Sequence, residues 1–244
     1  MEISLAAESL FHIGPLAVTN SMVVSWAVGL FFIILSLFVY YGYSHLPTKL
    51  KITLEIILEG LMGLVEGVAG PKARDFFPLI ATFFLYILFS NLTGIIPGVG
   101  TIGFHMELHG QERFIPILRG PTADLNTTLA LAIVSVAAAQ LYSIKYLGFK
   151  GWLSRFFNFK NPISFFMGIL DIVTEFAKII SFSFRLFGNI FAGEVLLAVM
   201  LFLIPFIVPV PFIGLEIFVA FIQALVFSML SLVFITVASE RSQH

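Results

Sequence analysis

The chain has 244 residues, of which 59% are hydrophobic and only 11% are charged, and its mean hydropathy is +1.04. Soluble domains carry about 25% charged residues, so this composition indicates a protein that lies in lipid. The net charge of −1 gives no reason to expect a nucleic-acid partner, and the lack of cysteine excludes disulfides and thiolate metal sites.

The first two thirds of the chain predict three membrane-spanning helices and one helix on the membrane surface. A spanning helix needs about 20 largely apolar residues, and the stretches that meet this need are 21–43, 76–96 and 122–146. Charged side chains recur among apolar ones along residues 47–70. This two-sided helical pattern favours an amphipathic helix lying on the membrane over a short linker helix in water.

The connecting segments indicate the orientation of the chain. Lysine and arginine collect after the first and third spans, so the positive-inside rule puts the C-terminus in the cytoplasm and residues 1–20 outside. The polar loop at residues 98–121 is then external too. It contains His105 and His109 at helical spacing but no third ligand at a diagnostic distance, so we expect no metal site. We expect Asp124 in the first helical turn of the next span.

The C-terminal part predicts two long helices. Residues 162–204 are apolar and, at 1.5 Å per residue, form about 65 Å of helix, twice a hydrocarbon core of about 30 Å. A hairpin of two spans competes with one steeply tilted helix, and we favour the tilted helix because no proline interrupts the run. Pro205, Pro209 and Pro211 then make a turn, and residues 212–238 return antiparallel.

The expected fold is therefore all-α and polytopic. It forms a single integral membrane domain with about five membrane helices and one interfacial amphipathic helix. The last two helices are long, tilted and antiparallel.

Charged residues within the last two helices need an explanation, because a charge at the bilayer centre costs about 2.5–3.5 kcal/mol. Glu175 and Lys178 are spaced i,i+3, and two explanations stay open for them: structural pairing with each other or a functional role. A structural and a functional role stay open for Asp171 as well. Arg185 has no acid at i±3 or i±4. Since arginine stays protonated, its partner must come from another helix or another subunit, and we predict a functional role for it.

Two ionisable carboxyl groups extend this pattern. Glu194 and Glu216 lie on the two adjacent helices, and Gln223 follows Glu216 by seven residues on the same face. An acid on each of two helices, with polar partners, is what a proton path requires. Small residues let another helix approach closely. Those around Arg185 are Ser181, Gly188, Ala192 and Gly193.

Four motifs carry a resemblance to a known family. Residues 183–194, SFRLFGNIFAGE, closely resemble the signature of subunit a of F-type ATP synthases, and residues 223–227, QALVF, resemble its last-helix motif. Residues 121–126, PTADLN, and 91–97, NLTGIIP, resemble its earlier membrane motifs. The similarity spans nearly the whole chain.

The resemblance implies a non-catalytic, cofactor-free subunit of the bacterial inner membrane that translocates ions, with protons favoured over sodium. Its implied partners are a rotating ring of c subunits (the c-ring), the b subunits of the peripheral stalk, and membrane lipid. Arg185 and the four small residues around it, Ser181, Gly188, Ala192 and Gly193, would face the c-ring. The residues that would line or border two half-channels are Glu194, Glu216, Asn189, Gln223, Asp124, Asn126 and Asn91. The family often has histidine at the position of Glu216, so the glutamate here makes a histidine relay unexpected.

The alternative function is a self-contained secondary ion transporter or channel. It would predict inverted repeats and broken helices, and the sequence shows neither. The chain also lacks a GxxxxGK[ST] phosphate-binding loop, so we do not expect it to make ATP itself.

Overall fold

A computed structural model describes residues 8–14, 16–42, 47–96, 103–108, 111–156, 162–204 and 209–240. The helices are α1 (Asn20–Gly42), α2 (Thr48–Ala69), α3 (Ala73–Ile95), α4 (Leu125–Phe156), α5 (Pro162–Leu203) and α6 (Pro209–Ser239). Two short 3₁₀ turns, η2 (Gly70–Lys72) and η3 (Pro121–Ala123), precede α3 and α4. The strands are β1 (Ser9–Ile13), β2 (Leu16–Thr19), β3 (Gly103–Leu108) and β4 (Gln111–Pro116).

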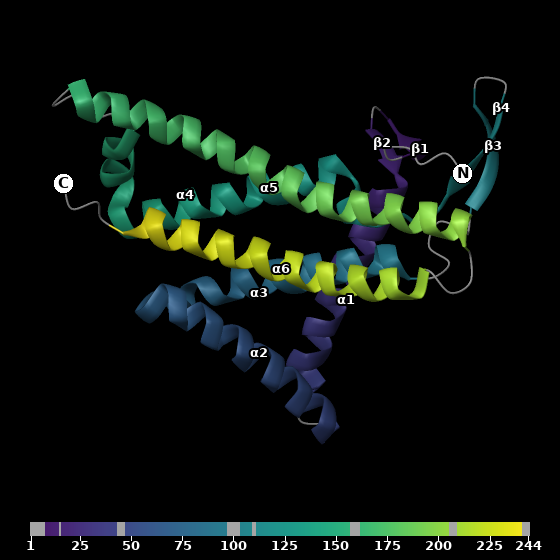
Figure 1. Ribbon diagram of the computed structural model, residues 1–244. Coiled ribbons are helices and arrows are strands. Elements are labelled where there is room, and N and C mark those ends of the chain that lie inside the picture. The colour runs from purple at the N-terminus through teal and green to yellow at the C-terminus, as the bar shows by residue number, and fades with distance from the viewer. Residues whose placement is uncertain are drawn as a thin grey trace.

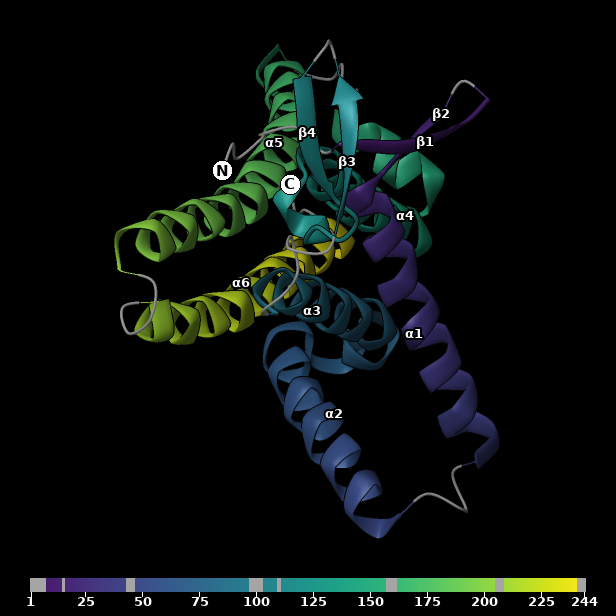
Figure 2. The ribbon, with the colours of Figure 1, turned by 90° about the vertical axis from the view of Figure 1, so that its right-hand side faces the viewer.

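Four helices form the body of the protein. α3, α4, α5 and α6 lie side by side with similar axis directions, and α5 runs antiparallel to α6 (Figure 1). α1 crosses this bundle, and α1 and α2 both extend away from it on the same side (Figure 2). Both hairpins lie near the end of the bundle where α5 stops, and the C-terminus lies at the opposite end (Figure 1).

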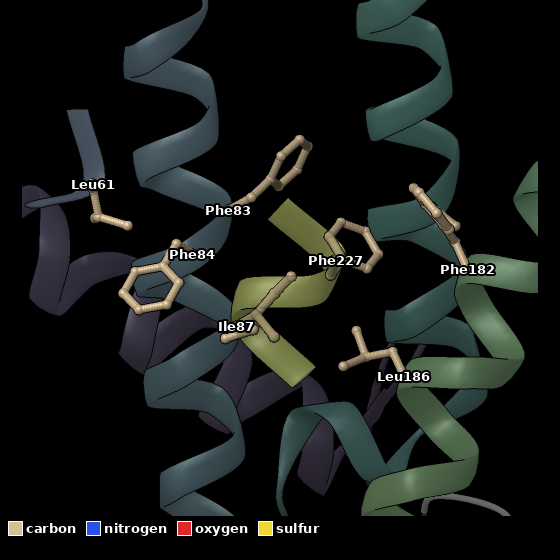
Figure 3. Close-up of a cluster of buried hydrophobic side chains, with 9 residues drawn as sticks. Leu61, Phe83, Phe84, Ile87, Phe182, Leu186 and Phe227 are labelled. Atoms are coloured by element: carbon tan, nitrogen blue, oxygen red, sulfur yellow. The ribbon is translucent and has the colours of Figure 1, made fainter. Parts of the chain in front are cut away.

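The core of the bundle is built around α6. Phe227 of α6 packs between Phe83 and Ile87 of α3 and Phe182 and Leu186 of α5 (Figure 3). Because lipid is as apolar as these side chains, the core stabilises the bundle through close packing more than through removal of water.

Hydroxyl pairs link α4 to its two neighbours. The hydroxyl groups of Ser135 and Ser231 are 2.6 Å apart between α4 and α6. Those of Thr128 and Ser183 are 3.1 Å apart between α4 and α5. These short side chains allow the helix backbones to come close while their hydroxyls bond to each other.

A second polar contact joins three helices at the C-terminal end of the bundle. The carboxylate of Asp75, in the first turn of α3, accepts hydrogen bonds from Tyr146 at 2.5 Å and from Lys145 at 2.9 Å, both on α4. Lys72 donates to the carbonyl of Ser239 at the end of α6 at 3.0 Å, and its ammonium lies 4.6 Å from the centre of the Tyr146 ring. This cluster fixes the ends of α3, α4 and α6 to one another.

The predicted all-α polytopic fold is confirmed. Within the described residues, five helical stretches are long and apolar enough to cross a membrane: α1, the run from α2 to α3, α4, α5 and α6. α5 is one uninterrupted helix of 42 residues, as expected. Its length of about 63 Å exceeds a hydrocarbon core of about 30 Å, which supports a steep tilt. The surface location of α2 stays a prediction.

Two helix boundaries differ from the predicted ranges. The helix predicted to end at residue 146 reaches a kink at Gly148, whose φ is 74°, and a further helical segment, included in α4, follows the kink and continues to Phe156. α6 begins at Pro209, so Pro209 and Pro211 lie in its first turn, where backbone N–H groups need no helical partner. The two β-hairpins in the expected external segments were not foreseen. Pro205 lies outside the described residues.

Candidate functional site

One face of α5 carries the arginine that the sequence singled out. Ser181, Arg185 and Asn189 are spaced by four residues, so they lie along one stripe of the helix, and all three are exposed. Phe182 and Leu186 point into the core instead (Figure 3). Arg185 therefore points out of the bundle.

The guanidinium of Arg185 has no hydrogen-bond or ion-pair partner in the described part of the chain. Ala192 is exposed on the same side of α5, and Gly188 has open space where a Cβ would stand. A hollow of about 240 Å³ extends from Arg185 along the groove between α5 and α6. Its lining includes Thr174, Lys178, Ser181 and Arg185 of α5 and Leu230 and Phe234 of α6. A carboxylate from another chain can therefore approach Arg185 without displacing a partner.

One turn beyond Arg185, Asn189 joins α5 to α6. Its Nδ2 donates a hydrogen bond to Oε1 of Gln223 at 2.7 Å. Gln223 is buried, and its Nε2 has no partner among the described residues. Because a buried amide donor without a partner is unfavourable, this N–H is suited to binding a water molecule or a visiting carboxylate.

Glu216 of α6 lies directly against α5. A Cβ added at Gly193 would stand 2.7 Å from Oε1 of Glu216, well inside van der Waals contact. The same Oε1 is buried and accepts no hydrogen bond from the described residues. Gly193, grouped above with the small residues around Arg185, thus faces Glu216, and this contact places Glu216 beside Glu194.

Glu194 lies where α5 meets the end of α3 and the segment before η3. Its Oε1 is next to the backbones of Gly94 and Gly120. Arg119 is close enough for its positive charge to act on Glu194, and Glu194 in turn acts on Glu216. The structure therefore brings together two carboxyl groups that the sequence analysis had placed on adjacent helices, and adds an arginine that the sequence reasoning did not select.

Asn91 extends this polar region into α3. Its Nδ2 donates to the carbonyl oxygen of Ala220 at 3.2 Å, one turn after Glu216. Its Oδ1 and the hydroxyl of Ser90 are buried without partners among the described residues. Polar atoms of this kind are where buried water binds, so the interface of α3, α5 and α6 is suited to hold water.

Asp124 caps α4 and does not lie within its first turn, which corrects the sequence prediction. α4 begins at Leu125, and Oδ1 of Asp124 accepts a hydrogen bond from the backbone N–H of Asn126 at 3.1 Å. Oδ2 accepts one from the hydroxyl of Ser21 in α1 at 2.7 Å. Aspartate favours this cap position because its short side chain can reach the free N–H groups. Asp124 is buried, whereas Asn126 is exposed.

A chain of ion pairs lies toward the start of α5. The predicted i,i+3 pairing is present, since Nζ of Lys178 lies 2.8 Å from Oε1 of Glu175. Arg155, at the end of α4, lies 3.1 Å from Asp171 and 3.7 Å from Glu175. Sequence spacing did not reveal Arg155, because its contacts depend on how α4 turns into α5. The two acids and two bases neutralise each other.

The described residues contain no group of three or more His, Cys, Asp or Glu side chains placed to hold a metal ion. His109, which belongs to the histidine pair noted in the sequence, lies outside the described residues.

Comparison with known proteins matches residues 22–236 to the family described as ATP synthase A chain. The chain is 31% identical to ATP synthase subunit a of Moorella thermoacetica over 93% of both chains. It is 33% identical to ATP synthase subunit a of Trichlorobacter lovleyi over 96% of this chain and 92% of that protein. It is also 33% identical to ATP synthase subunit a of Geobacter sulfurreducens over 88% of this chain and 86% of that protein. The chain belongs to the ATP synthase A chain family.

Proposed function

We propose that the chain is the ion-translocating stator subunit of a rotary ATP synthase, in which protons pass to and from the carboxylates of a rotating c-ring beside Arg185. The observation that carries this proposal is the exposed guanidinium of Arg185, which has no partner among the described residues and lies on a face of small residues. Arginine cannot release its proton, so it does not relay protons. It attracts a passing carboxylate and keeps it ionised.

Two polar regions lie on opposite sides of Arg185 along α5. Glu194 is nine residues further on, about 13.5 Å, and Lys178 is seven residues earlier, about 10.5 Å. We assign Glu194, Glu216 and their neighbours to a half-channel open to the outside. The hollow beside Lys178 belongs to a half-channel open to the cytoplasm. With this offset, a proton crosses the membrane only by travelling on a ring carboxylate.

The remaining polar residues have supporting places in this scheme. Asn189 and Gln223 border the passage between the outer half-channel and Arg185, and Asn91 lines the outer half-channel. Asp124 and Asn126 border it at the start of α4, where Asp124 fixes α4 to α1.

The proposed setting is the inner membrane of a bacterium, with the N-terminus external and the C-terminus cytoplasmic. Lys72 and Lys145 support this orientation because Lys72 bonds to Ser239 at the end of α6 and Lys145 bonds to Asp75 at the start of α3. The proposed partners are the c-ring, the b subunits of the peripheral stalk, and lipid. The chain acts without a cofactor and does not itself catalyse ATP formation.

The deciding experiment is ATP-driven acidification of inverted membrane vesicles that contain the whole complex. Arg185→Ala should abolish pumping, and Arg74→Ala, at an exposed arginine in the first turn of α3, should leave it intact. Pumping should persist without sodium and stop with a protonophore. Coupled pumping by Arg185→Ala would overturn the role of Arg185, and a sodium requirement would overturn the choice of the proton.

A further inference from the structure

The carboxyl group of Glu194 lies against two glycine backbones that come from different parts of the chain. Gly94 is in the last turn of α3, and Gly120 directly precedes η3. A Cβ added at Gly120 would stand 3.1 Å from Cα of Gly94 and 3.4 Å from Oε1 of Glu194. One added at Gly94 would stand 3.5 Å from Cα of Gly120 and 3.7 Å from the same Oε1. The two backbones therefore touch, and the carboxyl group lies over their contact.

Backbone conformation does not explain either glycine. Gly120 has φ −54° and ψ 124°, which any residue adopts. Gly94 lies within α3, where alanine is more favourable than glycine. A side chain at Gly120 would be crowded, whereas a Cβ at Gly94 would make ordinary contacts, and at both positions Oε1 of Glu194 is among the nearest atoms.

We propose that Gly94 and Gly120 are positioning residues for Glu194 and form a side-chain-free seat for its carboxyl group. This inference rests on the proposed function, in which Glu194 exchanges protons in the outer half-channel. The seat holds the carboxyl group at one place between α3, α5 and η3. Arg119, the residue before Gly120, provides a positive charge beside it.

The seat matters because proton exchange depends on position. A displacement of about 1 Å in a reacting group can lower a rate by about 100-fold. A methyl group at Gly120 would meet the carboxyl group and the Gly94 backbone at once, so either the carboxyl group or the α3–η3 contact must shift. A methyl group at Gly94 meets both at ordinary contact distances, so its effect should be smaller.

The test is ATP-driven acidification in vesicles containing the whole complex, with the amount of assembled complex measured by immunoblot. Gly120→Ala should lower the rate by about tenfold, equivalent to about 1.4 kcal/mol, and Gly94→Ala should lower it less. The single variant Glu194→Asp, whose side chain is one methylene shorter, should also pump slowly. Combined with Gly120→Ala it should pump faster than either single variant, because the shorter side chain makes room for the methyl group. Gly29→Ala, where a Cβ meets nothing within 4 Å, is the matched control.

A second measurement separates positioning from a general structural defect. The pumping rate is measured while the pH is varied on the side of the outer half-channel, which is the lumen of the inverted vesicles. The pH at half-maximal rate should move in Gly120→Ala and return toward the wild-type value in the double variant. Normal pumping by Gly120→Ala, or a double variant slower than both singles, would overturn the seat. If Gly120→Ala does not assemble, Gly94→Val is compared instead, because a side chain larger than a methyl group would press on the same carboxyl group, and normal pumping by Gly94→Val would overturn the seat.

Glu194→Gln distinguishes this inference from the proposed function. If Glu194→Gln loses pumping while both glycine variants pump normally, the seat fails and the proposed function stands. If Glu194→Gln pumps normally, the assignment of Glu194 to the half-channel fails, and the seat fails with it.

Discussion

The hydroxyl of Ser21 donates a 2.7 Å hydrogen bond to the buried carboxylate of Asp124, across 103 positions of sequence. The same carboxylate caps the first turn of α4 through the backbone N–H of Asn126. One side chain thereby sets where α4 begins and how α1 is held against it. Both contacts lie near the end of the bundle that holds Glu194, so the geometry of the proposed outer half-channel depends on them.

Replacing Asp124 should therefore affect stability. Asp124→Ala removes the cap and leaves Ser21 without its acceptor, so we expect a loss of about 1–3 kcal/mol in the free energy of unfolding. Asp124→Asn keeps a capping oxygen and should cost less. Thermal unfolding of the detergent-solubilised chain measures both. Ser21→Ala added to Asp124→Ala should cause little further loss. Fully additive losses would show that the two residues are not coupled.

The contact between Gly193 and Glu216 leads to a different expectation. A methyl group at Gly193 would meet only the far end of a flexible side chain, so Glu216 should swing aside without separating the helices. We expect Gly193→Ala to change the free energy of unfolding by less than about 1 kcal/mol, yet to lower pumping about tenfold or more because the carboxyl group is displaced.

Pumping and thermal stability should be measured on the same preparations. Glu216→Asp in the Gly193→Ala background should recover part of the rate, since the shorter side chain makes room. Gly214→Ala is the control, because a Cβ there meets nothing within 4 Å. Equal losses of pumping in Gly193→Ala and Gly214→Ala would contradict a specific effect on Glu216.

The sequence predicted most of the helices because membrane helices are defined by local apolar length. The uninterrupted run before Pro205 correctly predicted a single α5. The helical spacing around Arg185 predicted a cation with no acid of its own helix within reach, and Arg185 has no ion-pair partner among the described residues. The hairpins were missed because their strands have only four to six residues, and runs that short give no clear periodic signal.

The rest of the candidate site depends on contacts that no local pattern encodes. Gly94, near the end of α3, meets Gly120, just before η3, although the connection between α3 and η3 separates them in the sequence. The contacts of Arg155 depend on Gly148, where a positive φ redirects the chain after α4 has completed its span. Sequence spacing identifies neighbours on one helix, but packing between helices decides which residues of different helices meet.

The hydrogen bond between Asn189 and Gln223 should couple α5 to α6. Asn189→Ala removes the donor to Oε1 of Gln223, whose Nε2 already has no partner among the described residues. We therefore expect a loss of about 1–2 kcal/mol in the free energy of unfolding. A double-mutant cycle with Gln223→Ala should give a coupling of about 1 kcal/mol. The same cycle between Asn189 and Gln140, which instead accepts a hydrogen bond from Trp152, should give none. Equal coupling in both cycles would rule out a specific Asn189–Gln223 interaction.

The ion-pair chain toward the start of α5 gives the last prediction. Glu175 faces Lys178 and Arg155, with side chains 13%, 17% and 22% exposed. Exposed pairs contribute about 0–1 kcal/mol and breaking a buried pair costs about 3–5 kcal/mol. These partly buried side chains should fall between, so Glu175→Gln should lose about 1–3 kcal/mol in the free energy of unfolding. Arg155 keeps Asp171 as a partner, and the loss therefore falls mainly on Lys178.

Adding Lys178→Met to Glu175→Gln should recover most of that loss, because the cation left without a partner is removed and an apolar side chain remains against Phe234. Denaturation at low and high salt measures the effect, which should depend weakly on salt because the pair is shielded from solvent. Asp75→Asn is the comparison, since its pair with Lys145 is about half exposed, at 47% and 57%, and should contribute less than the Glu175 pair. A loss in Glu175→Gln no larger than in Asp75→Asn, or no recovery with Lys178→Met, would show that burial does not strengthen this pair. Glu175 and Lys178, beside the proposed cytoplasmic half-channel, could then be replaced without lowering the stability of the fold.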